Sequence, residues 1–231
     1  MSYNFSKTKK TLRKYLDRDR FEHSEGVMYT AAALAMRYGE NLEKAQIAGI
    51  LHDCAKCIPD NKKLKICEKN HIEITEAEKC SPFLLHAKVG AYIAKEKYDI
   101  EDAEILDAIA CHTTGKPAMT LLDKIIYISD YIEPMRSKAS NLEEVRKMAI
   151  GDEKVITCRP ADLLKPELES YKAEAGDLAK SEEDVLSYAL FPQVAKKFLA
   201  ERNDPSLKAA APKAKKPAGA VRELYVEDTG K

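Results

Sequence analysis

The sequence lacks an excess of charge of either sign, since 38 lysines and arginines balance 38 aspartates and glutamates over 231 residues. This balance removes the overall attraction that favours binding to nucleic acid or to an anionic membrane, and we expect neither as a partner. No apolar run approaches the length that crosses a bilayer, and the opening MSYNFSKTKK has no apolar signal-peptide core. We therefore expect a cytoplasmic protein.

Paired cysteines and strand patterns are also missing. The six cysteines are irregularly spaced, which is typical of reduced, mostly buried thiols. Cys54 and Cys57 form a C-x-x-C, but no second pair completes a zinc site and no strand precedes it, as a redox motif would require. No stretch alternates apolar and polar residues with period two. The sequence predicts an all-α fold.

Periodic apolar residues predict a series of helices. Gly39 is expected to end one helix in the left-handed conformation and Asn41 to cap the next, while the most apolar helix opens at Thr120 and stops at Pro134. Little periodicity is found over residues 70–82. The expected helices cover residues 7–20, 27–38, 42–56, 60–66, 84–98, 103–111 and 120–133.

Histidines and aspartates stand inside these apolar segments, where an unpaired polar group is costly. His52 and Asp53 are adjacent at the end of an apolar helical run. Because neighbours on a helix point about 100° apart, a metal beside the helix end can be held by both. His23 and Asp130, from other helices, are candidates for the remaining ligands.

His86 and His112 are candidates for holding a second ion close to the first. Imidazole combined with carboxylate suits iron, manganese or zinc better than calcium. In a two-metal site with ions about 3.5–4 Å apart, a bridging hydroxide attacks and both ions hold a phosphoryl oxygen. The candidate phosphate contacts are Arg20, Lys56, Lys116, Arg136 and the backbone of the turn Thr113, Thr114 and Gly115.

These patterns also have a plainer interpretation. A single histidine on an apolar helical face is more often a hydrogen-bonded core residue than a metal ligand, and a single Lys116 or Arg136 is more often a solvated surface charge. The spacing alone therefore supports a helical metal site and no particular substrate.

Five strings resemble a single family. They are RFEHSEGV, AGILHDCAK, LLHAKVGAYIA, HTTGKPAMTLLDKIIYISDYIEP and EEVRK. Over residues 9–147 the chain resembles the YqeK family of HD-domain symmetrical bis(5'-nucleosyl)-tetraphosphatases. This resemblance implies an HD-domain helical bundle and an iron-dependent enzyme, with manganese or another divalent metal as alternatives. The implied reaction cleaves diadenosine tetraphosphate to two ADP by attack of a metal-bound hydroxide.

The resemblance also implies roles for individual residues. The metal ligands would be His23, His52, Asp53 and Asp130, with His86 and His112 on the side of the second ion. Asp53 would also orient the attacking hydroxide, and the catalytic set would comprise Asp53, His52 and Lys56. Substrate contacts would fall on Arg20, Lys56, Thr113, Thr114, Gly115, Lys116 and Arg136. Two positions depart from the family pattern without removing a ligand: Met135 replaces the usual Asn, and Lys116 replaces a common Arg.

The rest of the chain resembles a different family. IGDEKVITCRPADLLKPELE and SEEDVLSYALFPQVAKKFLAERN resemble the helical segment after the barrel of biotin-dependent carboxylases, over residues 143–225. Short helices are expected from Pro166 and Ser181, followed by a disordered tail rich in Ala, Pro and Lys. No biotin-acceptor motif occurs, and no biotin is expected.

We interpret the chain as a fusion of an HD-domain part (1–147), a carboxylase-like helical fragment (148–205) and a flexible tail (206–231). The first part lacks the helices that normally close its bundle and the second lacks its barrel, so each is expected to expose apolar surface. The parts can cover one another, the chain can form a homodimer, or the C-terminal region can remain loosely packed. We expect the region beyond Pro160 to be sensitive to proteases.

Three functions remain open at this point. The first is symmetrical hydrolysis of diadenosine tetraphosphate. The second is hydrolysis of another phosphorylated nucleotide, because the metal site does not by itself select a substrate. The third is a non-catalytic helical remnant that binds a carboxylase partner.

Overall fold

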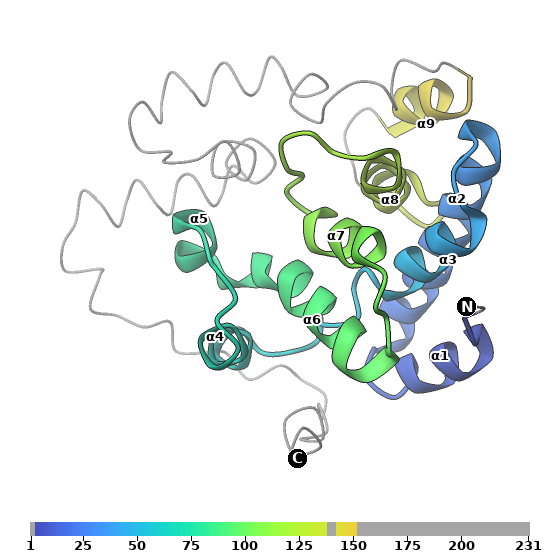
Figure 1. Ribbon diagram of the computed structural model, residues 1–231. Coiled ribbons are helices and arrows are strands. Elements are labelled where there is room, and N and C mark those ends of the chain that lie inside the picture. Colours follow the sequence, from blue (N-terminus) through green and yellow to red (C-terminus); the bar gives the residue numbers. More distant parts are fainter. Residues whose placement is uncertain (1–2, 138–141, 152–231) are drawn as a thin grey trace, which may run out of the picture.

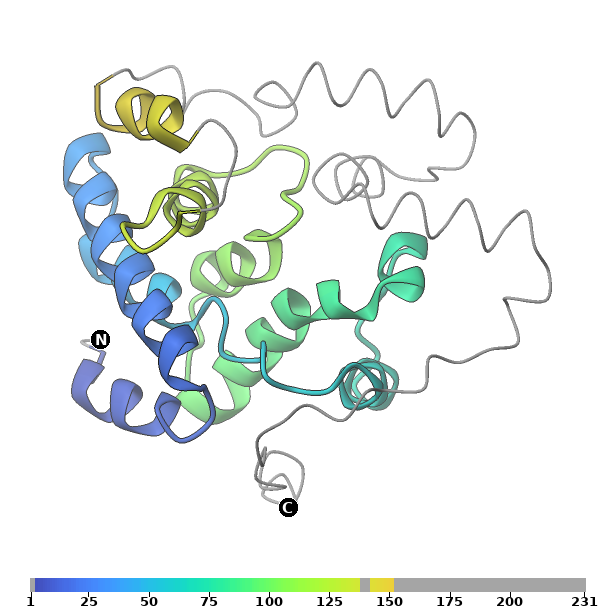
Figure 2. The same cartoon turned by 180° about the vertical axis from the view of Figure 1, so that it is seen from behind.

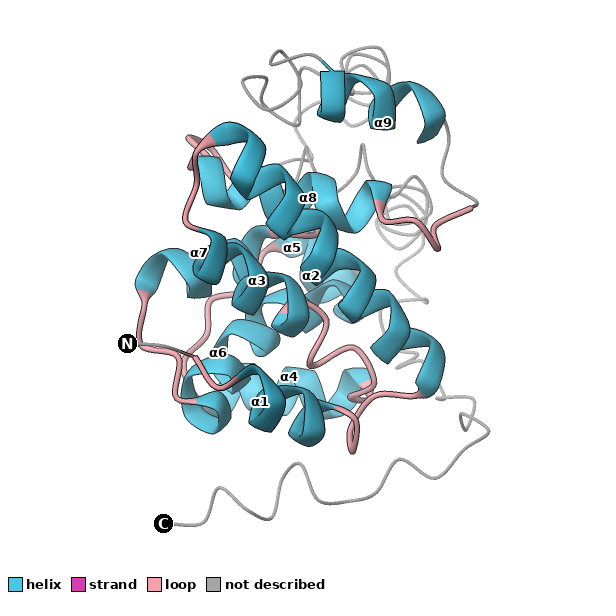
Figure 3. Cartoon of the chain, turned by 90° about the vertical axis from the view of Figure 1, so that its right-hand side faces the viewer, coloured by secondary structure: helices cyan, strands magenta, loops and turns pink. Residues whose placement is uncertain are grey.

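The computed structural model describes residues 3–137 and 142–151 (Figure 1). This part of the chain is built from helices, and Figure 3 shows no strand in it. The elements are α1 (Phe5–Leu12), α2 (Arg18–Tyr38), α3 (Leu42–Leu51), α4 (Asp60–Lys69), α5 (Glu76–Cys80), the 3-10 helix η1 (Pro82–Leu85), α6 (His86–Tyr98), α7 (Ala103–Cys111), α8 (Leu121–Ile132) and α9 (Leu142–Gly151). The all-α prediction is confirmed for these residues. None of these helices is both long and apolar enough to span a bilayer.

The core lies where α2, α3, α7 and α8 pack together. The long helix α2 lies along α3, and α8 packs against both α2 and α7 (Figure 2). Branched side chains fill the space between them without exposure to solvent, as at Ile47, Ile105 and Ile125. Burial of such side chains, each worth roughly 1.5–3 kcal/mol, is the main force that holds the helices together.

Several predicted helix ends are confirmed because they depend on local chemistry. Gly39 ends α2 with φ of 75°, and the Asn41 side chain caps α3 by accepting from the Lys44 N–H. The Thr120 side chain caps α8 and forms a capping box with Asp123. Helix α7 has the predicted bounds, Ala103–Cys111.

The start of α2 was predicted wrongly. The expected charged helix over residues 7–20 ends at Leu12, and α2 begins at Arg18 instead of residue 27. The Asp17 side chain accepts from the Arg20 N–H, and this N-cap starts the helix one turn before His23. His23 therefore belongs to a long regular helix.

The end of α3 also differs from the prediction, which continued the helix to residue 56. The helix ends at Leu51, and the following bonds run over three residues, from Cys54 N–H to the Leu51 carbonyl and from Lys56 N–H to the Asp53 carbonyl. This tighter turn carries both His52 and Asp53 into the interior, where each is almost completely buried.

The region before α6 contains more structure than expected. Helix α4 continues to Lys69, and α5 forms within the stretch that shows little periodicity, started by a capping box between Thr75 and Glu78. The predicted helix over residues 84–98 is divided into η1 and α6, so His86 is the first residue of α6. The helices expected from Pro166 and Ser181, the 148–205 fragment beyond Gly151 and the tail 206–231 lie outside the described residues.

Candidate metal centre

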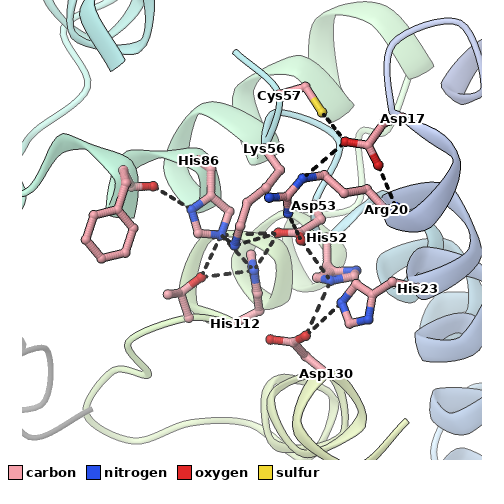
Figure 4. Close-up of polar contacts among 12 residues, drawn as sticks. Asp17, Arg20, His23, His52, Asp53, Lys56, Cys57, His86, His112 and Asp130 are labelled. Carbon is pink, nitrogen blue, oxygen red and sulfur yellow. Dashed lines mark hydrogen bonds and ion pairs between the residues drawn. The ribbon is translucent and has the colours of Figure 1, made fainter. Parts of the chain in front are cut away.

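Four histidines and two aspartates predicted as metal ligands converge from five helices (Figure 4). His23 lies on α2, His52 and Asp53 follow α3, His86 opens α6, His112 follows α7, and Asp130 lies on α8. Their side chains point toward one another in Figure 4. The packing of these helices therefore creates the cluster that the sequence only suggested.

Three of the histidines are held by the same local contact. In each, ring Nδ1 lies 2.7 Å from the carbonyl oxygen three residues earlier, in the pairs His52 with Gly49, His86 with Phe83 and His112 with Ile109. Because a carbonyl oxygen only accepts, Nδ1 must carry the hydrogen. Each Nε2 therefore keeps a lone pair, and these lone pairs face the cluster.

His23 is held by carboxylates instead. Its Nδ1 lies 3.1 Å from Glu133 Oε1, and its Nε2 lies 3.0 Å from Asp130 Oδ1. Burial lowers the pKa of His23, but the Asp130 and Glu133 carboxylates outweigh burial and raise it. A carboxylate behind a metal-binding imidazole fixes the ring and makes it a stronger ligand.

Glu133 was not among the predicted site residues. It is buried, and its Oε2 accepts from the Met135 N–H at 2.7 Å. Gly26 of α2 leaves the space that it fills, because a Cβ at Gly26 would lie 2.7 Å from Glu133 Oε2. The signal available in the sequence was a second acid three residues after Asp130, which places both acids on the same side of the chain.

Asp53 occupies the centre of the cluster. Its Oδ1 lies 3.2 Å from Nε2 of His86 and 3.5 Å from Nε2 of His112. Its Oδ2 lies 3.8 Å from Nε2 of His52. Burial alone would raise the pKa of the Asp53 carboxyl, but the His52 ring and the Lys56 ammonium outweigh burial and hold this pKa well below its usual range.

Asp130 faces the other side of His52. Its Oδ1 lies 3.8 Å from Nε2 of His52 and also contacts the Arg136 guanidinium. Burial would raise the pKa of Asp130, but the hydrogen bond from His23 and the nearby positive groups lower it. Both aspartates are therefore carboxylates at neutral pH.

The donors fit a divalent cation. Within the described residues, His23, His52 and Asp130 form one group of possible ligand atoms within 4.8 Å of one another, and His52, Asp53 and His112 form a second. Nε2 of His52 and Oδ1 of Asp53 are buried without a hydrogen-bond partner. Lone pairs of His86 and His112 face a carboxylate oxygen that also only accepts, and such contacts are unfavourable unless a proton or a cation lies between them.

The protonation states of the histidines agree with this fit. Burial lowers the pKa of both His52 and His86 to about 4. Their rings are therefore neutral at physiological pH, which is the form that binds a metal.

The predicted substrate contacts divide into two sets, and the first lies at the cluster. Lys56 Nζ lies 2.8 Å from His86 Nε2, and the Thr113 hydroxyl lies 3.0 Å from the same atom. Arg20 Nη1 lies 4.0 Å from Asp53 Oδ2. Arg136 donates to both the carbonyl and the carboxylate of Asp130.

The second set has partners in the loop between α7 and α8. Lys116 Nζ pairs with Asp107 and with the buried Asp123, at 3.0 and 3.1 Å. The Gly115 N–H donates to the Cys111 carbonyl, and Gly115 has φ of 71°. The Thr114 hydroxyl contacts the Gly115 carbonyl. These contacts stabilise the loop that carries Thr113.

Comparisons with known proteins are consistent with this geometry. The HD domain matches residues 20–135, and the conserved carboxylase domain matches residues 136–230. The chain is 43% identical over 141 residues to the symmetrical bis(5'-nucleosyl)-tetraphosphatase of Bacillus subtilis, covering 61% of this chain and 75% of that protein. It is 40% identical over 149 residues to the protein of the same name from Halalkalibacterium halodurans, covering 64% and 79%.

A solved structure and a second group of relatives extend the comparison. The crystal structure of an HD superfamily hydrolase involved in NAD metabolism from Clostridium acetobutylicum is 34% identical, with a TM-score of 0.67, and covers 87% of this chain and 100% of that chain. One of the pyruvate carboxylase subunits of Methanocaldococcus jannaschii is 54% identical over 61 residues, which are 26% of this chain and 11% of that protein. Both predicted resemblances are confirmed. The chain belongs to the HD-domain family of hydrolases through residues 20–135, and a conserved carboxylase domain match follows over residues 136–230.

Proposed function

We propose that this chain hydrolyses diadenosine tetraphosphate symmetrically to two molecules of ADP. The observation that carries the proposal is the buried cluster of neutral imidazoles and carboxylates, in which Nε2 of His52 and Oδ1 of Asp53 lack hydrogen-bond partners. The names of the Bacillus and Halalkalibacterium relatives support this choice of substrate.

Two divalent cations fit the donor set. His23, His52, Asp53 and Asp130 would hold the first, and His86 and His112 with Asp53 would hold the second. Bound ions would act as Lewis acids toward a phosphoryl oxygen and lower the pKa of a water. We propose iron as the metal, with manganese as the alternative, because imidazole and carboxylate ligands suit both.

The remaining side chains would bind and orient the substrate. Lys56 and Arg20 bring positive charge to the side of the cluster near Asp53, where a polyphosphate would be neutralised. The Thr113 hydroxyl is close enough to the histidine pair to donate to a phosphoryl oxygen. Asp53 Oδ1 would accept a hydrogen bond from the attacking water and so orient it. Arg136 would hold Asp130 and contact phosphate with its remaining donors.

The proposed reaction balances with water as the only co-substrate. The water oxygen attacks one of the two central phosphorus atoms and forms a new P–O bond, while the bond from that phosphorus to the central bridging oxygen breaks. The bridging oxygen leaves with the second ADP, and the protons of water are released to solvent at neutral pH. In ¹⁸O-water, one of the two ADP molecules from each turnover should therefore carry the label.

Product analysis tests the proposal. Purified protein supplied with Fe²⁺ or Mn²⁺ should convert diadenosine tetraphosphate to ADP alone, and the appearance of ATP with AMP would contradict symmetrical cleavage. A panel of other dinucleotides and nucleotide phosphates tests the alternative substrates. Metal analysis of the purified protein tests the choice of iron. A protein without metal-dependent turnover that co-purifies with a biotin protein would favour the non-catalytic alternative.

We also propose a cytoplasmic location. The five cysteines of the described residues are free thiols, as expected in a reducing compartment. The division of the chain after residue 147 and the homodimer stay predictions. Limited proteolysis and light scattering test them, respectively.

A further inference from the structure

Helix α9 belongs by sequence to the range matched by the carboxylase domain, yet it packs on the HD-domain helices. Figure 1 shows α9 beside the end of α2 and next to α8. The Tyr38 hydroxyl of α2 donates to the Ala149 carbonyl of α9 at 2.8 Å. The folded unit around the metal centre therefore continues beyond residue 135, where the HD-domain match ends.

The contact that reaches toward the centre is made by Arg146. Its Nε donates to the Ile132 carbonyl at 3.0 Å, and its Nη2 donates to the carbonyls of Glu133 and Arg136 at 2.8 and 3.0 Å. These carbonyls belong to the end of α8 and the turn after it, where a helix leaves its last carbonyl groups without partners. Pro134 adds to this shortage because it has no N–H to donate. One guanidinium thus holds three backbone groups within a single short segment.

The segment that Arg146 holds, residues 132–136, supports two metal ligands. Glu133 contacts His23 through Oε1, and Arg136 contacts the carboxylate of Asp130. The ligands His23 and Asp130 also contact each other. A shift of this segment would therefore move the supports of both ligands at once.

We propose that Arg146 is a positioning residue of the metal centre. It fixes the backbone of residues 132–136 so that Glu133 orients His23 and Arg136 orients Asp130. The site is then incomplete within the HD-domain match and needs one residue from the range that matches the carboxylase domain. This inference rests on the proposed role of the cluster as a metal centre, but it does not depend on the identity of the substrate.

Arg146→Lys in the full chain tests the proposal. Lysine keeps the charge, but a single ammonium cannot replace the planar fork that reaches three carbonyls. Loss of a group that orients metal ligands typically weakens metal binding about 10–100-fold, and we expect Mn²⁺ affinity to fall by about tenfold. Calorimetric titration with Mn²⁺ measures this affinity, and the electron paramagnetic resonance spectrum of bound Mn²⁺ reports the change in its ligand environment.

Tyr38→Phe is the matched control. It removes the hydroxyl that donates to Ala149, and so loosens α9 without touching residues 132–136. We expect it to lower the melting temperature while leaving Mn²⁺ affinity within about twofold of wild type. If Arg146 only attached α9 to the bundle, the two variants would weaken Mn²⁺ binding equally, and that result would overturn the proposal.

Glu133→Gln keeps the test decisive even if Arg146→Lys does not fold. Wild-type Mn²⁺ affinity in Glu133→Gln would leave Arg146 no support of His23 to position and would also overturn the proposal. Where both variants fold, the loss in the double variant should be smaller than the product of the two single losses, because both act partly through one contact. A wild-type chain that binds Mn²⁺ but leaves diadenosine tetraphosphate intact would refute the proposed function alone.

Discussion

Gly49 and Gly90 are buried helical glycines that should respond differently to the same substitution. A Cβ at Gly49 would lie 2.9 Å from the Met28 Cα, 3.2 Å from the Met28 nitrogen and 3.3 Å from the Val27 oxygen. All three are backbone atoms of α2, so no side chain can turn away, and α2 and α3 must separate by roughly 0.5–1 Å to reach normal contact distance. A Cβ at Gly90 would meet its nearest atom, the His52 oxygen, at 3.4 Å.

The magnitudes follow from two opposing effects. Alanine stabilises a helix interior by about 1 kcal/mol relative to glycine. Overpacking costs about 1–3 kcal/mol, and backbone contacts place Gly49→Ala at the upper end of that range. We therefore expect Gly49→Ala to lower the free energy of unfolding by about 2 kcal/mol, and Gly90→Ala to change it by less than about 1 kcal/mol.

The assay compares thermal unfolding and Mn²⁺ binding in the two variants. A loss of about 2 kcal/mol corresponds to a fall in melting temperature of roughly 4–8 °C for a chain of this size. Because α2 carries His23 and α3 ends at His52, separation of these helices should also weaken Mn²⁺ binding in Gly49→Ala by about tenfold. Equal melting temperatures and equal Mn²⁺ affinities in the two variants would refute the reasoning from close helix packing.

Three further outcomes test the centre itself. Asp53→Ala should lower turnover of diadenosine tetraphosphate at least about 100-fold, because it removes the carboxylate that contacts the histidines and orients water; near wild-type turnover would exclude it from the mechanism. Removal of metal by a chelator should lower the melting temperature, and Mn²⁺ at about 100 times its dissociation constant should restore about 2.7 kcal/mol. In the metal-free protein, His52 and His86 each have a pKa of about 4 when folded and about 6.5 when unfolded. The unfolded chain therefore binds more protons in this window, and stability should fall as the pH decreases from about 6.5 to about 4, by roughly 3 kcal/mol for each histidine; a flat denaturation profile over this range would contradict the buried neutral state.

Helix ends set by local chemistry were predictable from the sequence, whereas those set by tertiary contacts were not. Asn41 and Thr120 cap the helices that follow them because a single side chain reaches the next free N–H groups. The end of α3 at Leu51 could not be inferred in this way. Apolar spacing continues to Ala55, but the interior position of His52 and Asp53 requires the tighter turn that follows Leu51.

Two local signals were present and were overlooked. Asp17 is an acceptable N-cap for α2, but Gly26 interrupts the apolar pattern and suggested a later start. That glycine is tolerated because α2 is long and the space beside it is filled by Glu133. Thr75 and Glu78 have the spacing of a capping box and start α5 in a stretch without apolar periodicity.

The candidate ligands were predictable for a different reason. His52, Asp53 and Asp130 are polar groups in apolar helices, and their burial cost already required a partner. The support of His23 was not predictable from spacing, because His23 and Glu133 are separated by 110 residues in sequence and meet only through packing of α2 against the end of α8. Sequence patterns can therefore indicate which groups need a cation, whereas the groups that orient them depend on the complete bundle.

The position of the junction between the two matched families also has a physical consequence. The HD-domain match ends at residue 135, in the middle of the segment that Arg146 holds. The string Glu143–Lys147 belongs to both resemblances, so a junction within it leaves an arginine at position 146 whichever parent supplied it. A junction a few residues earlier, without this string, would have left the carbonyls of Ile132 and Glu133 without these donors. Retention of the shared string is therefore the condition under which a fusion of these two families keeps its metal ligands in place.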